Sequence, residues 1–177
     1  MERSEREKLI LQKIKEQDRA LESDRLTIRE HIVNYLKKEK LYKEQDIEVG
    51  KVFDIYVSED CNGTASTDIV IKVGDRRLIA IKCAPNSIES RERHIISLSR
   101  VADEFVIPIS VVTDAETTKI IDTFTGNVIS EDIRALPSRA ELNPNDYPQK
   151  KWTEDRAEKE KRILLAFESI SCPMGEL

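Results

Sequence analysis

Asp68 and Lys82 are charged residues inside otherwise apolar stretches of the chain. A carboxylate and an ammonium group on one surface are suited to phosphodiester hydrolysis. Oxygen ligands hold a hard divalent cation that polarises the phosphoryl group and acidifies a water, while a nearby cation stabilises the developing negative charge. Two carboxylates and one lysine suffice for this chemistry. The alternative is a cross-strand ion pair that performs no reaction.

The stretches around these two residues predict a buried hairpin. Residues 69–71 and 78–81 are apolar and mostly β-branched, and they flank a turn signal at Gly74. If the turn pairs Val73 with Arg77, Asp68 lies opposite Lys82 and Val70 lies opposite Ala80. Side chains alternate between the faces of a strand, so Asp68, Lys82 and Ala80 are expected on one face.

This face resembles the active site of the PD-(D/E)xK nuclease superfamily, and in particular the N-terminal domain of type I restriction enzyme R subunits and their small stand-alone relatives. Thr67-Asp68 corresponds to the first half of the motif, and the run from Ala80 through Lys82 to Pro85 corresponds to the second. The resemblance implies that Asp68 binds Mg²⁺ or Mn²⁺ and that Lys82 positions or activates the attacking water. Ala80 stands where the family has a second metal-binding acid, so metal binding is expected to be weakened.

Further candidates come from the neighbouring segments. In such domains a glutamate near the metal often lies on the first core helix, which suggests Glu30, and Glu48 near the first strand is a second candidate ligand. Arg93, Ser97 and Arg100 on the helix after the motif are candidates for phosphate contact, and the alternative is an ordinary solvated helix face. The family often has glutamine and tyrosine four residues apart in this helix; their places are taken here by Ser97 and Val101, a second departure from the family pattern.

Hydrophobic periodicity predicts an α/β fold: a restriction-endonuclease-like mixed sheet flanked by helices, with helical appendages at both ends. We expect three segments: an N-terminal helical arm (1–22), a nuclease-type core (23–142), and a linker with a C-terminal helix (143–177). Ser23-Asp24 offers a break or a new helix start between the first two. In the last segment the helix should follow Thr153, and a flexible tail should begin at residue 171. The predicted strands are 47–57, 67–73, 77–83 and 106–113, the last two parallel; the predicted core helices are 25–39 and 88–104, and 58–66 is a predicted polar loop.

Composition narrows the functional classes. The chain has 177 residues, 36% of them charged, and a net charge of −5, which argues against a nonspecific polyanion binder and leaves room for a local basic surface. The cysteines Cys61, Cys83 and Cys172 have no CxxC spacing, so neither a zinc site nor a disulfide framework is predicted. With no signal peptide and no apolar run long enough for a membrane, we expect a cytoplasmic location.

The sequence therefore predicts a metal-dependent DNA endonuclease-type domain whose second acid is replaced by Ala80, by natural loss or by engineering, and whose cleavage activity is lost or strongly impaired. The alternative is a noncatalytic module that keeps the fold to bind nucleic acid or protein. DNA is the expected partner. A homodimer through the terminal helices is also expected, because the arm carries a narrow apolar stripe of Ile10, Ile14 and Leu21 that a compact core leaves unused.

Overall fold

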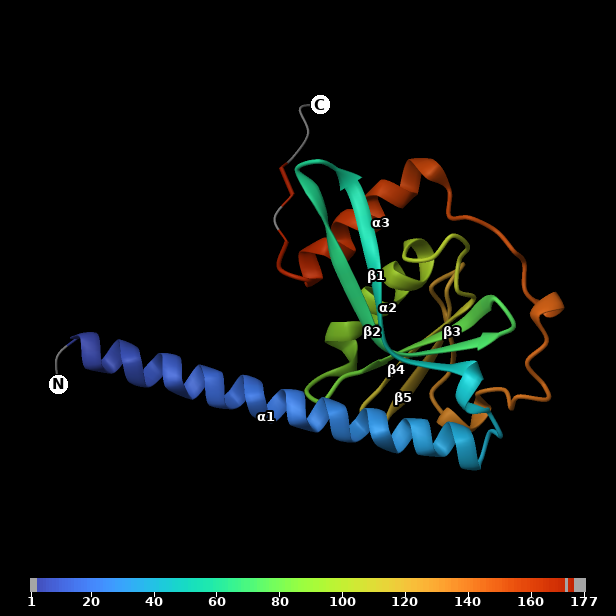
Figure 1. The fold of residues 1–177 in the computed structure, drawn as a ribbon, viewed down its shortest axis with the longest axis horizontal. Coiled ribbons are helices and arrows are strands. Elements are labelled where there is room, and N and C mark those ends of the chain that lie inside the picture. Colours follow the sequence, from blue (N-terminus) through green and yellow to red (C-terminus); the bar gives the residue numbers. More distant parts are fainter. Residues whose placement is uncertain (1–2, 171, 174–177) are drawn as a thin grey trace.

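The computed structural model describes residues 3–170 and 172–173, with the backbone alone for residues 3 and 4. The start of the predicted arm and most of the predicted tail lie outside the described residues. Within these residues, three α-helices and six strands follow one another (Figure 1), in the order α1 (Arg3–Lys38), β1 (Ile47–Ser58), β2 (Cys61–Val73), β3 (Arg76–Cys83), α2 (Ile88–Val101), β4 (Ile109–Thr113), β5 (Thr118–Asp122), β6 (Val128–Ser130) and α3 (Glu154–Phe167).

The six strands form one mixed sheet in chain order, which confirms the predicted α/β class. Strands β3 and β4 are parallel and joined through α2, as predicted, while the other neighbouring pairs are antiparallel. In the motif hairpin Val70 pairs with Ala80, as expected. The predicted turn pairing is wrong by one residue. The register shifts after Ile71, so that Val73 pairs with Arg76.

The sheet is covered on both faces, and each face has its own apolar core. One core joins sheet residues such as Val70, Ala80 and Val112 to α2 and α3, with Ile95, Leu98 and Leu164 buried among them. The other joins Ile69, Ile79 and Ile81 to the C-terminal half of α1, through residues including Ile32 and Leu36. Strands buried on both faces explain why the motif hairpin reads as two nearly continuous apolar runs.

The predicted break at Ser23-Asp24 is wrong, because α1 is one continuous helix of 36 residues. It contains no glycine or proline, and two contacts span the predicted break: Thr27 Oγ1 donates to the Ser23 carbonyl at 3.0 Å, and Arg25 pairs with Glu22. At 1.5 Å per residue the helix is about 54 Å long. Its C-terminal half packs on the sheet, while its N-terminal half projects beyond the globular part (Figure 1).

The predicted polar loop at 58–66 is also wrong, since β2 begins at Cys61 and the turn occupies residues 59–60. The Asn62 side-chain amide donates to the carbonyls of Ser58 and Glu59 at 3.0 and 2.8 Å, so it stabilises the tight turn from within the strand. Cys61 forms a disulfide with Cys172, which the cysteine spacing did not predict. The two cysteines lie 111 residues apart in sequence, and the C-terminal segment brings Cys172 to this hairpin.

Smaller differences concern the ends of elements. Strand β4 begins at Ile109 rather than near 106, because the Val106 and Ile107 amides donate to the carbonyls of Lys150 and Ser99 instead of to a neighbouring strand. Helix α2 ends at Val101, three residues before the predicted end. Helix α3 follows Thr153 as predicted and buries Leu164 and Leu165. Among the residues described, none of the helices has the length and apolar character that crossing a membrane requires.

Candidate functional site

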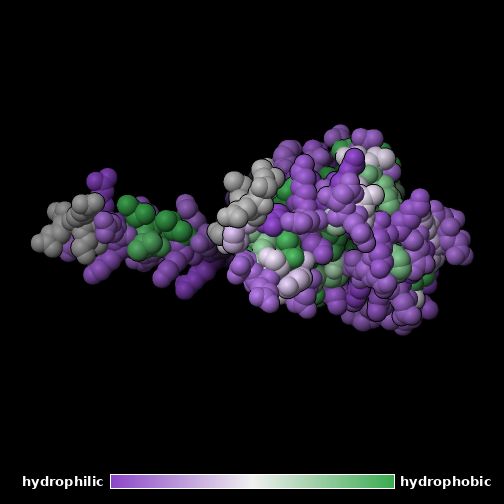
Figure 2. Space-filling view, turned by 90° about the horizontal axis from the view of Figure 1, so that it is seen from above, coloured by the Kyte–Doolittle hydropathy of each residue, from purple (hydrophilic) through white to green (hydrophobic). Residues whose placement is uncertain are grey.

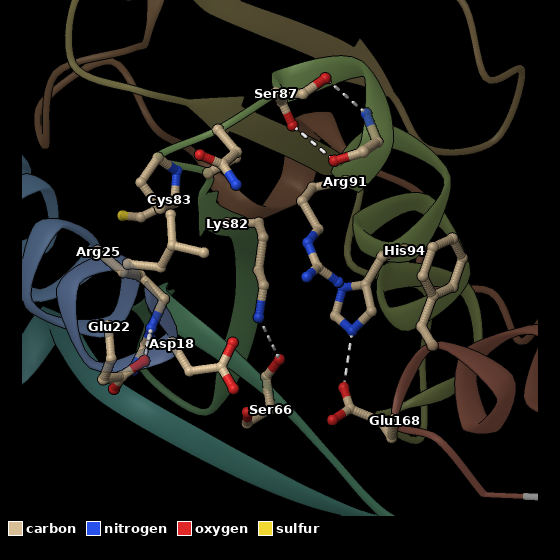
Figure 3. Close-up of a pocket in the computed structure, with 16 residues that line it drawn as sticks. Asp18, Glu22, Arg25, Ser66, Lys82, Cys83, Ser87, Arg91, His94 and Glu168 are labelled. Atoms are coloured by element: carbon tan, nitrogen blue, oxygen red, sulfur yellow. Dashed lines mark hydrogen bonds and ion pairs between the residues drawn. The ribbon is translucent and has the colours of Figure 1, made fainter. Parts of the chain in front are cut away.

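A cavity of about 450 Å³, here called the lysine pocket, opens where α1 passes the middle of β2 and the C-terminal end of β3 (Figure 3). Side chains from all three helices and from the motif hairpin line it. They include Asp18, Leu21, Glu22 and Arg25 of α1, Ser66 and Lys82 of the hairpin, Arg91 and His94 of α2, and Phe167 and Glu168 at the end of α3. The predicted motif lysine therefore faces a real cavity.

Asp68 lies beneath this pocket, fully buried, and both of its carboxylate oxygens are bound within the protein. Arg25 Nη1 donates to Oδ1, and the backbone amide of Cys83 donates to Oδ2 at 2.8 Å. Arg25 also donates through Nε to Glu22 at 2.9 Å, and these carboxylate partners raise the pKa of Arg25 further above its ordinary value. The charge of Asp68 is thus balanced by an arginine that the sequence analysis did not single out.

Lys82 extends into the pocket with little to hold its ammonium group. Its Nζ donates to the backbone carbonyl of Ser66 at 3.4 Å, the long end of the range for a hydrogen bond. Burial lowers the pKa of Lys82, and the nearby charges of Asp68 and Glu168 oppose that effect. An ammonium has three donors, so Lys82 keeps hydrogen-bonding capacity that points into the cavity (Figure 3).

A histidine and a glutamate form the opposite wall. His94 is buried, its ring packs edge-on against Phe167, and its Nε2 lies 2.8 Å from Glu168. Burial lowers the pKa of His94, so the ring is neutral near pH 7, donates through Nε2 to the carboxylate, and has its lone pair on Nδ1. Within the described residues Nδ1 has no partner. Burial alone would raise the pKa of Glu168, but the hydrogen bond from His94 brings it below its ordinary value.

The predicted metal ligands do not form a metal site. Ala80 is fully buried and offers no oxygen, and both oxygens of Asp68 are bound elsewhere. Glu30 is exposed beside Arg29, outside the lysine pocket, and Glu48 is held by Arg77 through hydrogen bonds of 2.7 and 3.0 Å. In the described part of the chain, no three acidic, histidine or cysteine side chains are grouped as metal ligands would be. The donor set does not fit the hard, oxygen-liganded Mg²⁺ that the resemblance implies.

The three residues predicted to contact phosphate lie together, but around a carboxylate of this chain. Glu160 of α3 is buried and accepts from Arg93 at 2.9 Å, from Ser97 at 2.8 Å and from Arg100 at 2.9 Å. Arg100 also stacks on the ring of Trp152, with 4.3 Å between its guanidinium carbon and the ring centroid. Burial would raise the pKa of Glu160, but these donors bring it below its ordinary value. The cluster ties α3 to α2.

Sequence reasoning missed Arg25, Arg91, His94 and Glu168 as pocket residues. Arg25 and Glu168 lie on elements far in sequence from the motif, and no local pattern distinguishes them from other charged helix residues. Arg91 and His94 are three residues apart on α2 and so share a helix face, which is a signal that could have paired them.

The chain matches the model of a known protein family. The model of the family described as type I restriction enzyme R protein N terminus matches residues 26–137, more than half of the chain. The matched segment contains α1 from Leu26 to its end, the whole sheet and α2, and it ends before α3. Neither the search of curated proteins nor the search of solved structures gave a match.

Proposed function

The chain belongs to the type I restriction enzyme R protein N-terminus family, and from this we propose that it is a nuclease-type domain that binds DNA through the lysine pocket without metal-dependent cleavage. The observation that carries the proposal is the pairing of Arg25 with Asp68 beside the free donors of Lys82. Family membership supports DNA as the ligand. The finer assignment to the PD-(D/E)xK superfamily is part of the same proposal, based on Asp68 and Lys82 at the motif positions.

An anion would bind here locally rather than through the charge of the whole pocket. The acidic side chains Asp18, Glu22 and Glu168 line the cavity in the same number as the basic Arg25, Lys82 and Arg91, but Arg25 is bonded to the buried Asp68 and Lys82 keeps donors that face the cavity. Arg91 at the rim adds a further, exposed cation that points toward the same space (Figure 3). Glu22 is 56% exposed, so solvent screens it more than it screens the buried groups. A DNA phosphate entering the pocket would meet Lys82 and Arg91, and charge-assisted hydrogen bonds of this kind are the strong ones.

Acidic overall charge limits this binding to a local surface. With a net charge of −5, nonspecific attraction over the whole molecule is weak, so affinity should depend on a few phosphate contacts in the pocket. A cytoplasmic location is also part of this proposal. Because cytosolic thiols are kept reduced, Cys61 and Cys172 would be expected as thiols there, and trapping of free thiols in denatured lysate would report their state.

The test is DNA binding by fluorescence anisotropy, with cleavage followed in parallel. Lys82→Met removes the ammonium and keeps an unbranched side chain, and we expect at least about tenfold weaker binding, or about 1.4 kcal/mol. Lys72→Met is the matched control, because Lys72 lies on the same hairpin near its turn and outside the pocket. Binding should be the same in Mg²⁺ and in chelator. Equal affinities for both variants, or Mg²⁺-dependent cleavage by the unaltered protein, would overturn the proposal.

Restoring the missing acid gives a second test. Positions 80 and 82 share a face of β3, so Ala80→Glu would supply a carboxylate beside Lys82, but Arg25 would still hold Asp68. We therefore expect Mn²⁺ binding by calorimetry in Ala80→Glu combined with Arg25→Ala, and little in either single variant. Metal binding by Ala80→Glu alone would mean that Arg25 does not block the site.

A further inference from the structure

The N-terminal half of α1 carries apolar side chains that have no place in the core. Every side chain from Glu5 to Ala20 is exposed, and Leu9, Ile10, Leu11 and Ile14 are each 47% to 58% exposed. Figure 2 shows them as a hydrophobic patch on the projecting helix, away from the globular part. Because α1 is continuous, this segment cannot fold back onto its own sheet. A solvated helix of this length is only marginally stable alone, so a partner surface is expected.

Part of the patch follows a coiled-coil pattern. Ile10, Ile14, Gln17 and Leu21 are spaced alternately by four and three residues, which places them along one narrow seam of the helix. Leu9 and Leu11 lie to either side of it, each about 100° around the helix from Ile10. The seam ends at Leu21, which lines the lysine pocket.

Charge along the same segment identifies the partner. Residues 5–15 contain four basic and two acidic residues, and residues 16–25 contain two basic and four acidic residues. The first half therefore has a net positive charge and the second half a net negative charge of the same magnitude. A second copy in parallel would set like halves together, whereas an antiparallel copy would set each half against its opposite.

We propose that two copies of this chain associate through an antiparallel pairing of residues 5–25. The sign of the charge changes between Lys15 and Glu16. A two-fold axis at that point sets Ile10 against Leu21 of the second copy and Ile14 against Gln17, so the apolar seam and the charge halves select the same register. The N-terminal end of one arm then lies beside the pocket end of the other. This inference goes beyond the proposed function, because it concerns the association of two copies rather than DNA, although the C-terminal end of the segment, including Leu21 and Arg25, also lines the lysine pocket.

The first experiment measures association without DNA, by sedimentation velocity over a wide range of protein concentration. We expect a concentration-dependent dimer. Ile14→Asp should raise its dissociation constant at least about tenfold, because it sets a charge in the seam. Leu9→Asp is the matched control: Leu9 is 49% exposed against 47% for Ile14, lies on the same helix, and is off the seam. A monomer at the highest concentration, or equal weakening by both substitutions, would overturn the proposal.

A second experiment tests the direction of pairing. Ile10→Cys and Leu21→Cys are made as separate proteins and oxidised together. Antiparallel pairing predicts mainly the mixed disulfide between the two proteins, while parallel pairing predicts disulfides between like proteins and would contradict the register. Both positions lie on the exposed or half-exposed arm, and thermal unfolding would verify that the globular part is unaltered. Because no DNA is present, failure here leaves the pocket proposal standing, and the reverse also holds.

Discussion

Replacing Arg25 by alanine should destabilise the protein because it leaves the buried carboxylate of Asp68 without its charge partner. Asp68 has no exposed surface and would keep only the hydrogen bond from the Cys83 amide. Removing one member of a buried ion pair typically costs about 3–5 kcal/mol. Arg25 is 25% exposed and borders a cavity that water can enter, so the cost should lie at or below the lower end of that range, and we expect a loss of about 2–3 kcal/mol in the free energy of unfolding.

A double-mutant cycle separates this pair from other effects of the substitution. Asp68→Asn removes the charge and keeps an acceptor for the Cys83 amide, so alone it should cost about 1 kcal/mol. In the Asp68→Asn background, Arg25→Ala should cost much less than it does in the unaltered protein. We expect a coupling free energy of about 1.5–2 kcal/mol between the two positions.

The assay is urea unfolding of the four proteins at neutral pH, under conditions in which the transition is two-state. Arg29→Ala is the control, since Arg29 lies one turn along α1 and forms no ion pair with any residue that the structure describes. Its effect should stay within about 0.5 kcal/mol. A coupling free energy near zero, or equal losses for Arg25→Ala and Arg29→Ala, would refute the assignment of Arg25 as the charge partner of Asp68.

Three further predictions concern other parts of the molecule. Glu160→Ala should lower the free energy of unfolding by about 3 kcal/mol, because it leaves two arginines without their carboxylate. The folded state lowers the pKa of Glu160, so this stabilisation is present above the ordinary pKa of 4.5 and is lost as the pH falls through the lower pKa of the folded state. A variant as stable as the parent at pH 7 would exclude this role. Cys172→Ser should lower stability in oxidising buffer by up to about 4–5 kcal/mol, the entropy of closing a loop of this length, and should match the reduced parent in urea unfolding; a parent unaffected by reductant would contradict it. The pKa of Lys82 is lowered from its ordinary value of 10.5, so DNA binding should weaken as the pH rises through this lowered pKa and the ammonium loses its charge. Lys82→Arg should keep binding to higher pH in the same anisotropy titration, because a guanidinium stays charged.

Local pattern in the sequence was enough for the sheet and for the motif. The β-branched runs at 69–71 and 78–81 predict the hairpin, and the pairing of Val70 with Ala80 follows from the turn to within a one-residue shift. Periodicity also predicts α2, β4 and α3, with errors of a few residues at their ends. The absence of an acid at position 80 is a property of the sequence alone, and the structure adds only that the position is buried.

Local sequence pattern could not predict which polar side chains bind one another. Arg93 and Arg100 share a helix face in the sequence, but only the packing of α3 places the buried Glu160 against them, so candidates for phosphate contact became an internal cluster. The Cys61–Cys172 disulfide has the same origin, because no spacing rule connects residues 111 positions apart.

Asp68 gives the clearest case. Its place on the motif strand follows from alternation, which depends on neighbours in sequence, but its partner Arg25 is 43 residues away on a helix that the sequence predicted to begin anew near that point. Because α1 runs unbroken past the middle of β2 and the end of β3, it carries the Arg25 guanidinium to the Asp68 carboxylate. Hydrophobic periodicity specifies which face of an element is buried. Which charges then meet depends on how separate elements pack, and that is decided by the tertiary structure.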